Sequence, residues 1–533
     1  MHSPRPHSAV RLVAALLPLV GAAALGVPAA LSASPSPSTP NTAVVTYETH
    51  AALRRALGRH PARIVRRLPD VRSVEVRPAD LRSFAAGVSR LSGIASVETP
   101  EPRFSASEPG LTAMYSAGVP YQWQYTATRA SAVPDAVLRA AAGVKIAVID
   151  TGADVTAPDL AAKSPETYNV LNGSTDVRDF HGHGTFVASI AGGSVSNGEG
   201  IAGFGGDAPL LLVQSGRADG SFTDVDEADA IVYAVNHGAK VINLSIGGTE
   251  TSSVEKKALD YAAAHGVLVV AAAGNEFEDG NPIEYPAALL QPVGSKGRGG
   301  IGLSVGATTK AGVRASFSNT GSWISLAAPG ENVLGAVSSL SKARNWPRYP
   351  LPGSTTGLYG FSSGTSFAAP QVAGAAALVW AANPSLTRDQ VVWILKRTAS
   401  GDGTWTKGLG YGVLDVGRAV ATAQNGGEIV PPARAFSTLR VLRRQVRRTR
   451  VDVRARLSSR LDAISPAGRR VSLQLRRNGR WHRIARARTK AGGRVVLKAR
   501  LRPGRYVLRL KYAGAPELTA AASGRVVLKV GRR

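Results

Sequence analysis

Short apolar runs alternate with amphipathic stretches through the middle of the chain, over residues 144–308. The apolar runs are VKIAVID, PLLLVQ, KVINLSIGG, VLVVAAAGN and IGLSVGAT. Between them, residues 224–237 and 254–265 carry apolar positions at helical spacing. Continuous apolar strands separated by helices indicate a parallel sheet that helices cover on both faces. We therefore predict a three-layer α/β domain, in which functional side chains gather beyond the carboxyl ends of the strands.

A smaller unit precedes this domain, over residues 42–104. Its segments TAVVTYE, VRSVEV and IASVET have the composition of strands, whereas HAALRRAL and ADLRSFAAGVSRL have the spacing of helices. Strands and helices at this density predict a compact α+β domain.

The first 33 residues have the features of a secretory signal peptide. Arg5 and Arg11 precede an apolar run, and the small-residue stretch LSASPSPSTP follows it. We expect residues 1–33 to be removed, residues 34–41 to form a linker and the mature protein to be extracellular. No later stretch is long and apolar enough to span a bilayer, so we predict no transmembrane span in the mature form.

The last hundred residues follow a different period. After a linker at residues 428–437, residues 438–533 alternate apolar and polar positions and are interrupted by NG, AGG and PG turns. In this pattern Val471, Leu473 and Leu475 share one face. Repeated hairpins of this kind predict an antiparallel β-sandwich that resembles immunoglobulin-like modules.

Composition narrows the chemistry of the chain. The absence of cysteine excludes disulfides, thiolate metal sites and a cysteine nucleophile. The net charge is +28, and residues 432–533 hold 30 Lys and Arg against three acidic residues. This excess favours binding to polyanions such as cell-envelope polymers, with retention at the envelope. A solvated, arginine-rich β-domain is the alternative, and no nucleic-acid recognition motif is present, so we expect no specific nucleic acid as a partner.

Four polar residues stand at ends of the predicted elements. Asp150 ends the run VKIAVID and Asn275 ends VLVVAAAGN. His183 opens a helix in HGHGTFVAS, and Ser366 precedes an apolar helix in GTSFAAP. Each alone is an ordinary turn former, cap or surface side chain. An acid, a base, a hydroxyl and an amide at the edge of one sheet together indicate a nucleophilic active site.

The segments VIDTGAD, HGHGTFVAS, AAAGN and GTSFAAP resemble the active-site motifs of subtilisin-like serine proteases, the subtilases, in that family's order Asp, His, Asn, Ser. The resemblance covers residues 121–424 and implies a peptidase domain at residues 105–427. It implies a catalytic triad of Asp150, His183 and Ser366, with Asn275 in the oxyanion hole.

The resemblance implies a secreted serine endopeptidase that hydrolyses peptide bonds through an acyl-enzyme and needs no catalytic cofactor. Serine requires a base at neutral pH, and an imidazole oriented by a carboxylate supplies one. His183 fits the family's His-Gly-Thr pattern, whereas His181 lies outside the helix. Pro370 should bend or restart the helix that follows Ser366. Residues 42–104 resemble the family's propeptide, a folding aid and intramolecular inhibitor that the zymogen removes by self-processing.

The resemblance also implies where protein and peptide substrates bind. Ser245, Ile246 and Gly247 match the segment whose backbone pairs with an extended substrate. After Asn275 the loop EFEDGNPIEYP is unusually acidic, and Glu276 stands near the expected specificity pocket. One interpretation is a preference for Arg or Lys before the scissile bond; the others are a solvated acidic loop and a metal-binding loop.

Structural calcium is a further expectation from the resemblance. Asp159 and Asn197 match two ligands of a stabilising calcium site in the family, where oxygen atoms coordinate the ion. The alternative is that both residues form turns. No catalytic metal is implied.

Two other functions use the same sequence differently. The protein could be an envelope- or polyanion-binding protein whose protease fold is a scaffold, or a peptide ligase or cyclase that uses the same triad. Loss of a catalytic residue would favour the scaffold, yet all four residues are present.

Overall fold

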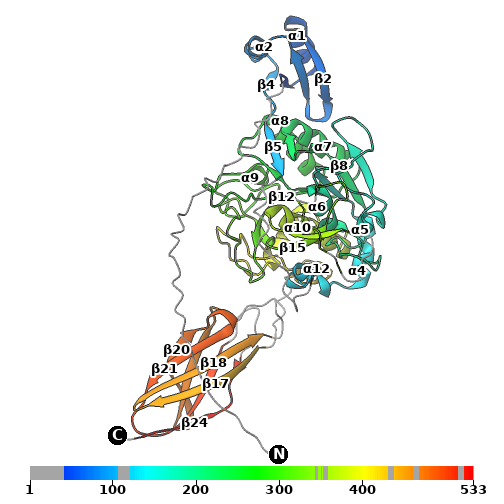
Figure 1. Cartoon of the computed structure of the whole chain (residues 1–533). Helices are drawn as coiled ribbons and strands as arrows, with labels where there is room; N and C mark the ends of the chain where they lie inside the picture. Colours follow the sequence, from blue (N-terminus) through cyan, green and yellow to red (C-terminus); the bar gives the residue numbers. More distant parts are fainter. Residues whose placement is uncertain are drawn as a thin grey trace, which may run out of the picture. The chain divides into compact units, whose positions relative to one another are not determined.

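The computed structural model describes residues 41–105, 121–342, 346–349, 351, 358–429, 437–459, 467–513 and 521–531 (Figure 1). The predicted signal peptide and most of the two predicted linkers lie outside these residues. Among the residues described, no helix has the length and apolar character needed to cross a membrane.

The first unit is an antiparallel sheet with two helices. Its strand order is β2-β3-β1-β4. Apolar side chains of the strands and of both helices share one core, and each helix is capped at its N-terminus by a side-chain oxygen. The elements are β1 (Ala43–Tyr47), α1 (His50–Arg59), β2 (Ala62–Leu68), β3 (Ser73–Pro78), α2 (Leu81–Val88) and β4 (Ile94–Glu98). The predicted strands and helices are present; β2 was not predicted.

The central domain is built on a parallel sheet, as predicted. The seven strands have the order β14-β13-β12-β10-β6-β8-β7, and each neighbouring pair is parallel. The strands are β6 (Ile146–Asp150), β7 (Glu166–Asn169), β8 (Leu210–Gln214), β10 (Val241–Leu244), β12 (Leu268–Ala272), β13 (Gly302–Thr308) and β14 (Leu326–Pro329). The edge strands β7 and β14 were not predicted from the sequence.

Helices cover both faces of this sheet. Ile146 and Val148 of β6 pack in the core that contains α6 (His183–Gly192) and α10 (Thr365–Ala382). Their neighbours Ala147 and Ile149 pack in the core that contains α7 (Asp224–Asn236) and α8 (Ser253–Ala264). Alternate residues of one strand thus serve two cores, which explains why the strands are apolar at every position.

The order of the strands indicates which edge of the sheet is expected to hold a functional site. β8 lies on one side of β6, and β10 lies on the other. The chain therefore changes direction at β6, and side chains at its carboxyl end face a switch point of the sheet, where α/β proteins bind their ligands.

Shorter elements surround this framework. They are α3 (Trp123–Ala127), α4 (Asp135–Ala140), α5 (Pro158–Ala161), α9 (Ala287–Leu290), α11 (Arg388–Thr398), α12 (Val416–Gln424), the hairpin of β15 (Val333–Ala336) and β16 (Tyr359–Ser362), and a small sheet of β5 (Pro102–Ser105), β9 (Ser221–Thr223) and β11 (Ile246–Gly247).

The C-terminal region is antiparallel β-structure. One sheet has the order β17-β18-β21 and the other contains β20-β19-β22-β23 with β24 paired to β22. Both sheets contribute to one apolar core, which includes the predicted face of Val471, Leu473 and Leu475. The immunoglobulin-like connection of the strands remains a prediction. The elements are β17 (Ser437–Arg447), β18 (Arg450–Ser459), β19 (Arg470–Arg477), β20 (Arg480–Arg488), β21 (Arg494–Arg500), β22 (Gly504–Tyr512), β23 (Ala521–Ala522) and β24 (Val526–Val530).

Candidate active site

Asp150 and His183 form a buried pair beyond the carboxyl end of β6. Asp150 is the last residue of β6, and His183 is the first residue of α6. His183 Nδ1 lies 2.7 Å from Asp150 Oδ1, and the side chains are 0% and 1% exposed. A carboxylate at this distance holds the proton on Nδ1, so Nε2 is the ring nitrogen that can accept another.

Close contact between the two elements requires glycine at position 184. A Cβ atom there would lie 2.1 Å from the carbonyl oxygen of Gly152 and 3.1 Å from Asp150 Cβ. Gly184 therefore lets the start of α6 approach the end of β6 closely enough for the Asp150–His183 hydrogen bond.

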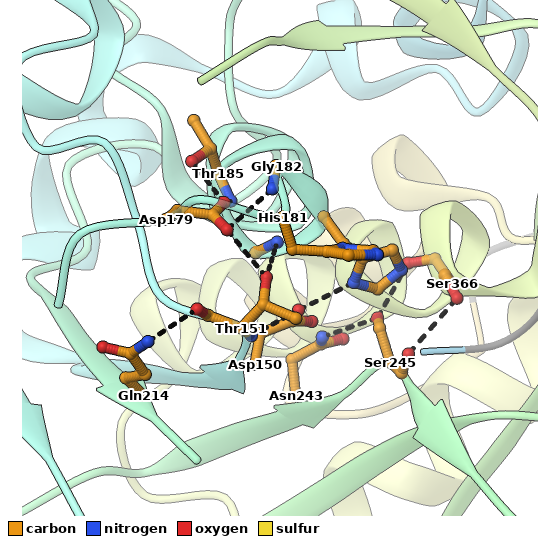
Figure 2. A network of polar contacts seen from close by, with 12 residues as sticks. Asp150, Thr151, Asp179, His181, Gly182, Thr185, Gln214, Asn243, Ser245 and Ser366 are labelled. Carbon is orange, nitrogen blue, oxygen red and sulfur yellow. Dashed lines mark hydrogen bonds and ion pairs between the residues drawn. The ribbon is translucent and has the colours of Figure 1, made fainter. Parts of the chain in front are cut away.

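Asp179, which sequence reasoning did not single out, fixes the loop that leads to His183. Its buried carboxylate accepts hydrogen bonds from Gly182 N at 2.7 Å and Thr151 Oγ1 at 2.9 Å (Figure 2). Thr185 donates to it twice, through N at 2.8 Å and Oγ1 at 2.6 Å. Four donors on one carboxylate hold the first turn of α6 against the end of β6. The only signal in the sequence is an acid four residues before the histidine.

His181 lies outside α6, as predicted, and Trp346 packs beside both histidines. Trp346 Nε1 donates to the carbonyl oxygen of His181 at 2.7 Å. Its ring centroid is 6.4 Å from that of His183. Trp346 lies in the segment between β15 (Val333–Ala336) and β16 (Tyr359–Ser362).

Ser366 lies in the first turn of α10 and exchanges hydrogen bonds with Ser245. Ser366 Oγ donates to the Ser245 carbonyl oxygen at 3.3 Å, and Ser245 Oγ donates to the Ser366 carbonyl oxygen at 2.8 Å (Figure 2). The helix does not restart at Pro370 but continues to Ala382. Pro370 has no N–H and cannot donate to the carbonyl oxygen of Ser366, four residues earlier. The Ser245 hydroxyl donates to this oxygen instead.

Asn275 is held against the same helix start. Its Oδ1 accepts hydrogen bonds from Thr365 N at 2.8 Å and Thr365 Oγ1 at 2.9 Å. Both contacts engage the oxygen end of the amide, so its NH₂ end faces away from Thr365. The Asn275 side chain therefore links the segment after β12 to the N-terminus of α10.

A strand of the chain itself lies against the predicted substrate-binding segment. β5 pairs antiparallel with β11, so that Phe104 faces Gly247 and Ser105 faces Ile246. On its other side β5 pairs antiparallel with β9. β5 is thus the middle strand of a three-stranded sheet, in the position where an extended peptide would add to the domain.

Comparison with known proteins identifies the domain that holds this site. The subtilase family matches residues 141–412, which is just over half of the chain.

The chain belongs to the subtilase family.

Curated subtilases resemble it over the same region. The thermophilic serine proteinase of Bacillus sp. (strain AK1) is 36% identical over 287 residues, 53% of this chain and 63% of that protein. Thermitase of Thermoactinomyces vulgaris is 36% identical over 271 residues, 50% of this chain and 86% of that protein. The match therefore spans less than two thirds of the thermophilic serine proteinase and more than two thirds of thermitase.

A solved structure resembles the fold over more of the chain. Fervidolysin from Fervidobacterium pennivorans, a keratinolytic enzyme related to subtilisin, has a TM-score of 0.60 and 21% identity, covering 92% of this chain and 76% of that one. At this identity the likeness concerns the fold.

In this subtilase the acidic loop after Asn275 is only partly solvated. Glu276 Oε2 accepts hydrogen bonds from Asn275 N at 2.6 Å and Asn319 Nδ2 at 3.3 Å, so Glu276 braces the loop. Glu284 lies nearer the predicted substrate strand, because its Oε2 would be 2.8 Å from a Cβ atom at Gly247. Burial, and then the neighbouring Glu276, raise the pKa of Glu284 to about 8. Glu278 is exposed.

Asp159 and Asn197 lie together, but their contacts do not fit calcium ligands. Asn197 turns its Nδ2 donor toward Asp159 Oδ1 at 3.1 Å, and Ile201 N lies 3.3 Å from the same oxygen. Tyr359 also hydrogen-bonds this carboxylate, and burial raises its pKa to about 6. Calcium requires several oxygen ligands, whereas the groups facing Asp159 are donors. Within the described ranges, no cluster of three or more His, Cys, Asp or Glu side chains could hold a metal ion.

Proposed function

We propose that the protein is a secreted serine endopeptidase, made as a zymogen, whose triad is Asp150, His183 and Ser366. The observation that carries this proposal is the buried 2.7 Å contact between Asp150 and His183 at the carboxyl end of β6, in a chain of the subtilase family. The reaction is hydrolysis of a peptide bond.

The proposed mechanism gives each of these side chains one role. Ser366 Oγ, which now donates to Ser245 O, gives its proton to Nε2 of His183 as it attacks the substrate carbonyl. Asp150 keeps the imidazole in the required tautomer and stabilises its positive form. His183 then passes the proton to the leaving amine, and water resolves the acyl-enzyme with His183 again as base.

Asn275 and the start of α10 suit an oxyanion hole. Thr365 contacts the Oδ1 end of the Asn275 amide, and we assign its NH₂ end as the donor to the negative oxygen of the tetrahedral intermediate. The backbone N–H of Ser366 is the second donor, at the positive end of an 18-residue helix.

Residues 42–104 fit a propeptide that inhibits the enzyme until it is removed. Glu98 Oε2 accepts hydrogen bonds from Ser253 N at 3.0 Å and Ser253 Oγ at 2.7 Å, at the N-terminus of α8. Arg66 pairs with Asp226 of α7 at 2.8 Å. Val44 and Leu68 join the apolar core of the peptidase domain. β5, at the end of this unit, occupies the proposed substrate position and would block it.

The C-terminal region is proposed to hold the secreted enzyme on anionic cell-envelope polymers. In β21, Val495 and Leu497 are buried, and the exposed positions hold Arg494, Lys498 and Arg500 together with Val496. In β24, Lys529 and Val527 are exposed between buried apolar residues. Adsorption to a polyanionic matrix should therefore weaken as salt rises. No observation favours the scaffold or the ligase alternative.

The test of the proposed function is hydrolysis of an unfolded protein substrate by the full-length chain after maturation. Ser366→Ala should abolish hydrolysis, whereas Ser304→Ala, at a buried serine within β13, should retain it. A serine-reactive fluorophosphonate should add the mass of its phosphonyl group, with loss of fluoride, to wild type and not to Ser366→Ala. Full hydrolysis by Ser366→Ala would refute the triad.

A further inference from the structure

Arg103 is the one residue of β5 whose side chain enters the peptidase domain as a fully buried ion. It is 0% exposed, whereas its neighbour Phe104 is 37% exposed. Arg103 Nη2 lies 2.9 Å from Glu255 Oε2, and Nε lies 3.5 Å from Glu227 Oε2. Both carboxylates are themselves 0% exposed.

The pocket that receives Arg103 is built from the first turns of two helices. Glu227 comes from α7, where it follows Asp224, and Glu255 comes from α8. Thr251 Oγ1 donates to Glu255 Oε2 at 2.6 Å and so helps to orient it. The wall of the pocket is Gly248, where a Cβ atom would lie only 3.2 Å from Arg103 Nη1 and 3.3 Å from Cδ. The absence of a side chain at Gly248 therefore leaves room for the arginine side chain along this wall.

Without Arg103, this pocket would hold buried acids and no cation from β5. No described group donates a hydrogen bond to either oxygen of Glu227. Burial raises the pKa of Glu227 well above its usual value, Glu255 adds to the rise, and Arg103 opposes it. Buried carboxylates that lose their partner are costly, so the emptied pocket favours a new cation.

The register of β5 gives the position of this pocket along a substrate. Phe104 faces Gly247 and Ser105 faces Ile246. A peptide that continues in this register brings its next residue opposite Ser245, whose carbonyl contacts Ser366 Oγ. Counted back from the bond after that residue, Arg103 stands fourth.

We propose that Glu227 and Glu255 form a specificity pocket for arginine at the fourth residue before the scissile bond of substrates. This inference rests on the proposed function and adds the class of sequence that the enzyme cuts. Arginine suits the pocket better than lysine, because Nε and Nη2 reach two different carboxylates and a single ammonium reaches one. The propeptide then acts as a first substrate, and its Arg103 occupies the pocket until cleavage.

The test compares fluorogenic peptides of sequence Pro-Arg-Phe-Ser-Ala with the same peptides that carry citrulline, lysine or alanine in place of arginine. Citrulline keeps the shape and removes the charge. The mature enzyme should cleave the arginine peptide with a kcat/KM at least about 30-fold above the citrulline peptide, as expected for one partner of a buried ion pair. Lysine should fall between them.

Pocket variants should change this ratio. Glu255→Gln and Glu227→Gln should bring the arginine-to-citrulline ratio close to one. Asp260→Asn removes a charge from the exposed side of α8, where Asp260 pairs with Lys256, and should retain the full ratio.

Each outcome separates this inference from the proposed function. Equal cleavage of the arginine and citrulline peptides by an active enzyme would overturn the pocket and leave the protease standing. Absence of all cleavage would refute the protease, and binding of the two peptides to Ser366→Ala would then decide the pocket. An unchanged ratio in both Glu→Gln variants would also overturn it.

Discussion

The buried contact between Asp150 and His183 differs from the buried contacts of Arg103 with Glu227 and Glu255 in how long it lasts. Asp150 and His183 belong to the same domain and stay together through the proposed reaction. Arg103 belongs to a strand that the proposed maturation removes, whereas Glu227 and Glu255 remain. The first pair orients a base permanently. Glu227 and Glu255 keep Arg103 as their cation only until maturation. After that, they favour a substrate that places an arginine in the same pocket.

The largest effect of a change of one atom is expected at Asp150, which orients His183. Asp150→Asn keeps the shape of the side chain but favours the wrong tautomer of His183, so kcat should fall by about 10⁴-fold. Steady-state kinetics on the mature enzyme measures this, and circular dichroism checks that the variant folds. Activity within tenfold of wild type would contradict the role of Asp150.

The contacts of Arg103 with Glu227 and Glu255 should affect the rate of maturation, because Arg103 is absent from the mature enzyme. Arg103→Ala should slow self-processing by about 30-fold, because it removes the cation from the buried acids. Arg63→Ala in β2, an exposed arginine of the same unit, is the matched control and should process normally. A time course of intact mass measures both rates. Equal rates would show that the ion pair does not guide cleavage.

The buried acid Glu284 should make the preference for arginine before the scissile bond depend on pH. Burial and Glu276 raise the pKa of Glu284 to about 8, and Arg103 opposes the rise. Glu284 is therefore mostly neutral at pH 7 and ionised at pH 9. If it faces the residue before the scissile bond, kcat/KM for arginine there, relative to alanine, should rise by about tenfold between these pH values.

Glu284→Gln should remove this rise while the pH dependence of the alanine peptide stays as in wild type. A flat ratio in wild type would place Glu284 outside the specificity pocket. It would also leave the basic preference expected from Glu276 without support.

The smallest effect is expected from calcium. Because donors surround Asp159, calcium or a chelator should leave the Tm of the full chain unchanged. Differential scanning calorimetry with and without EDTA measures this. A Tm raised by calcium in wild type and not in Asp159→Asn would restore the site that the sequence suggested.

Local patterns account for what the sequence predicted correctly. Strands such as β6 and β12 are uniformly apolar because both faces are buried, and the motifs around Asp150, His183, Asn275 and Ser366 are continuous segments. The strand β2, with its sequence ARIVRRL, escaped notice because three arginines interrupt its alternation. The edge strands β7 and β14 are each only four residues long.

The acidic pocket could not have been found in the same way. Arg103 and Glu255 are 152 positions apart in sequence. Each acid stands at an ordinary position for a helix first turn, where negative charge is favoured. Only the three-stranded arrangement of β9, β5 and β11 brings them to one arginine. For Asp159 and Asn197 the opposite holds. The family resemblance predicted that the two residues lie together, but the orientation of the Asn197 amide could not be predicted.

The most direct test is the intact mass of the full-length chain and of Ser366→Ala during maturation. The account predicts that wild type is cut after Ala106, so that the mature protein begins at Ser107 with Arg103 fourth before the cut, and that Ser366→Ala keeps its propeptide. A wild-type chain that folds and retains the propeptide would contradict the account. So would processing that persists in Ser366→Ala, or a cut that places no arginine at that position.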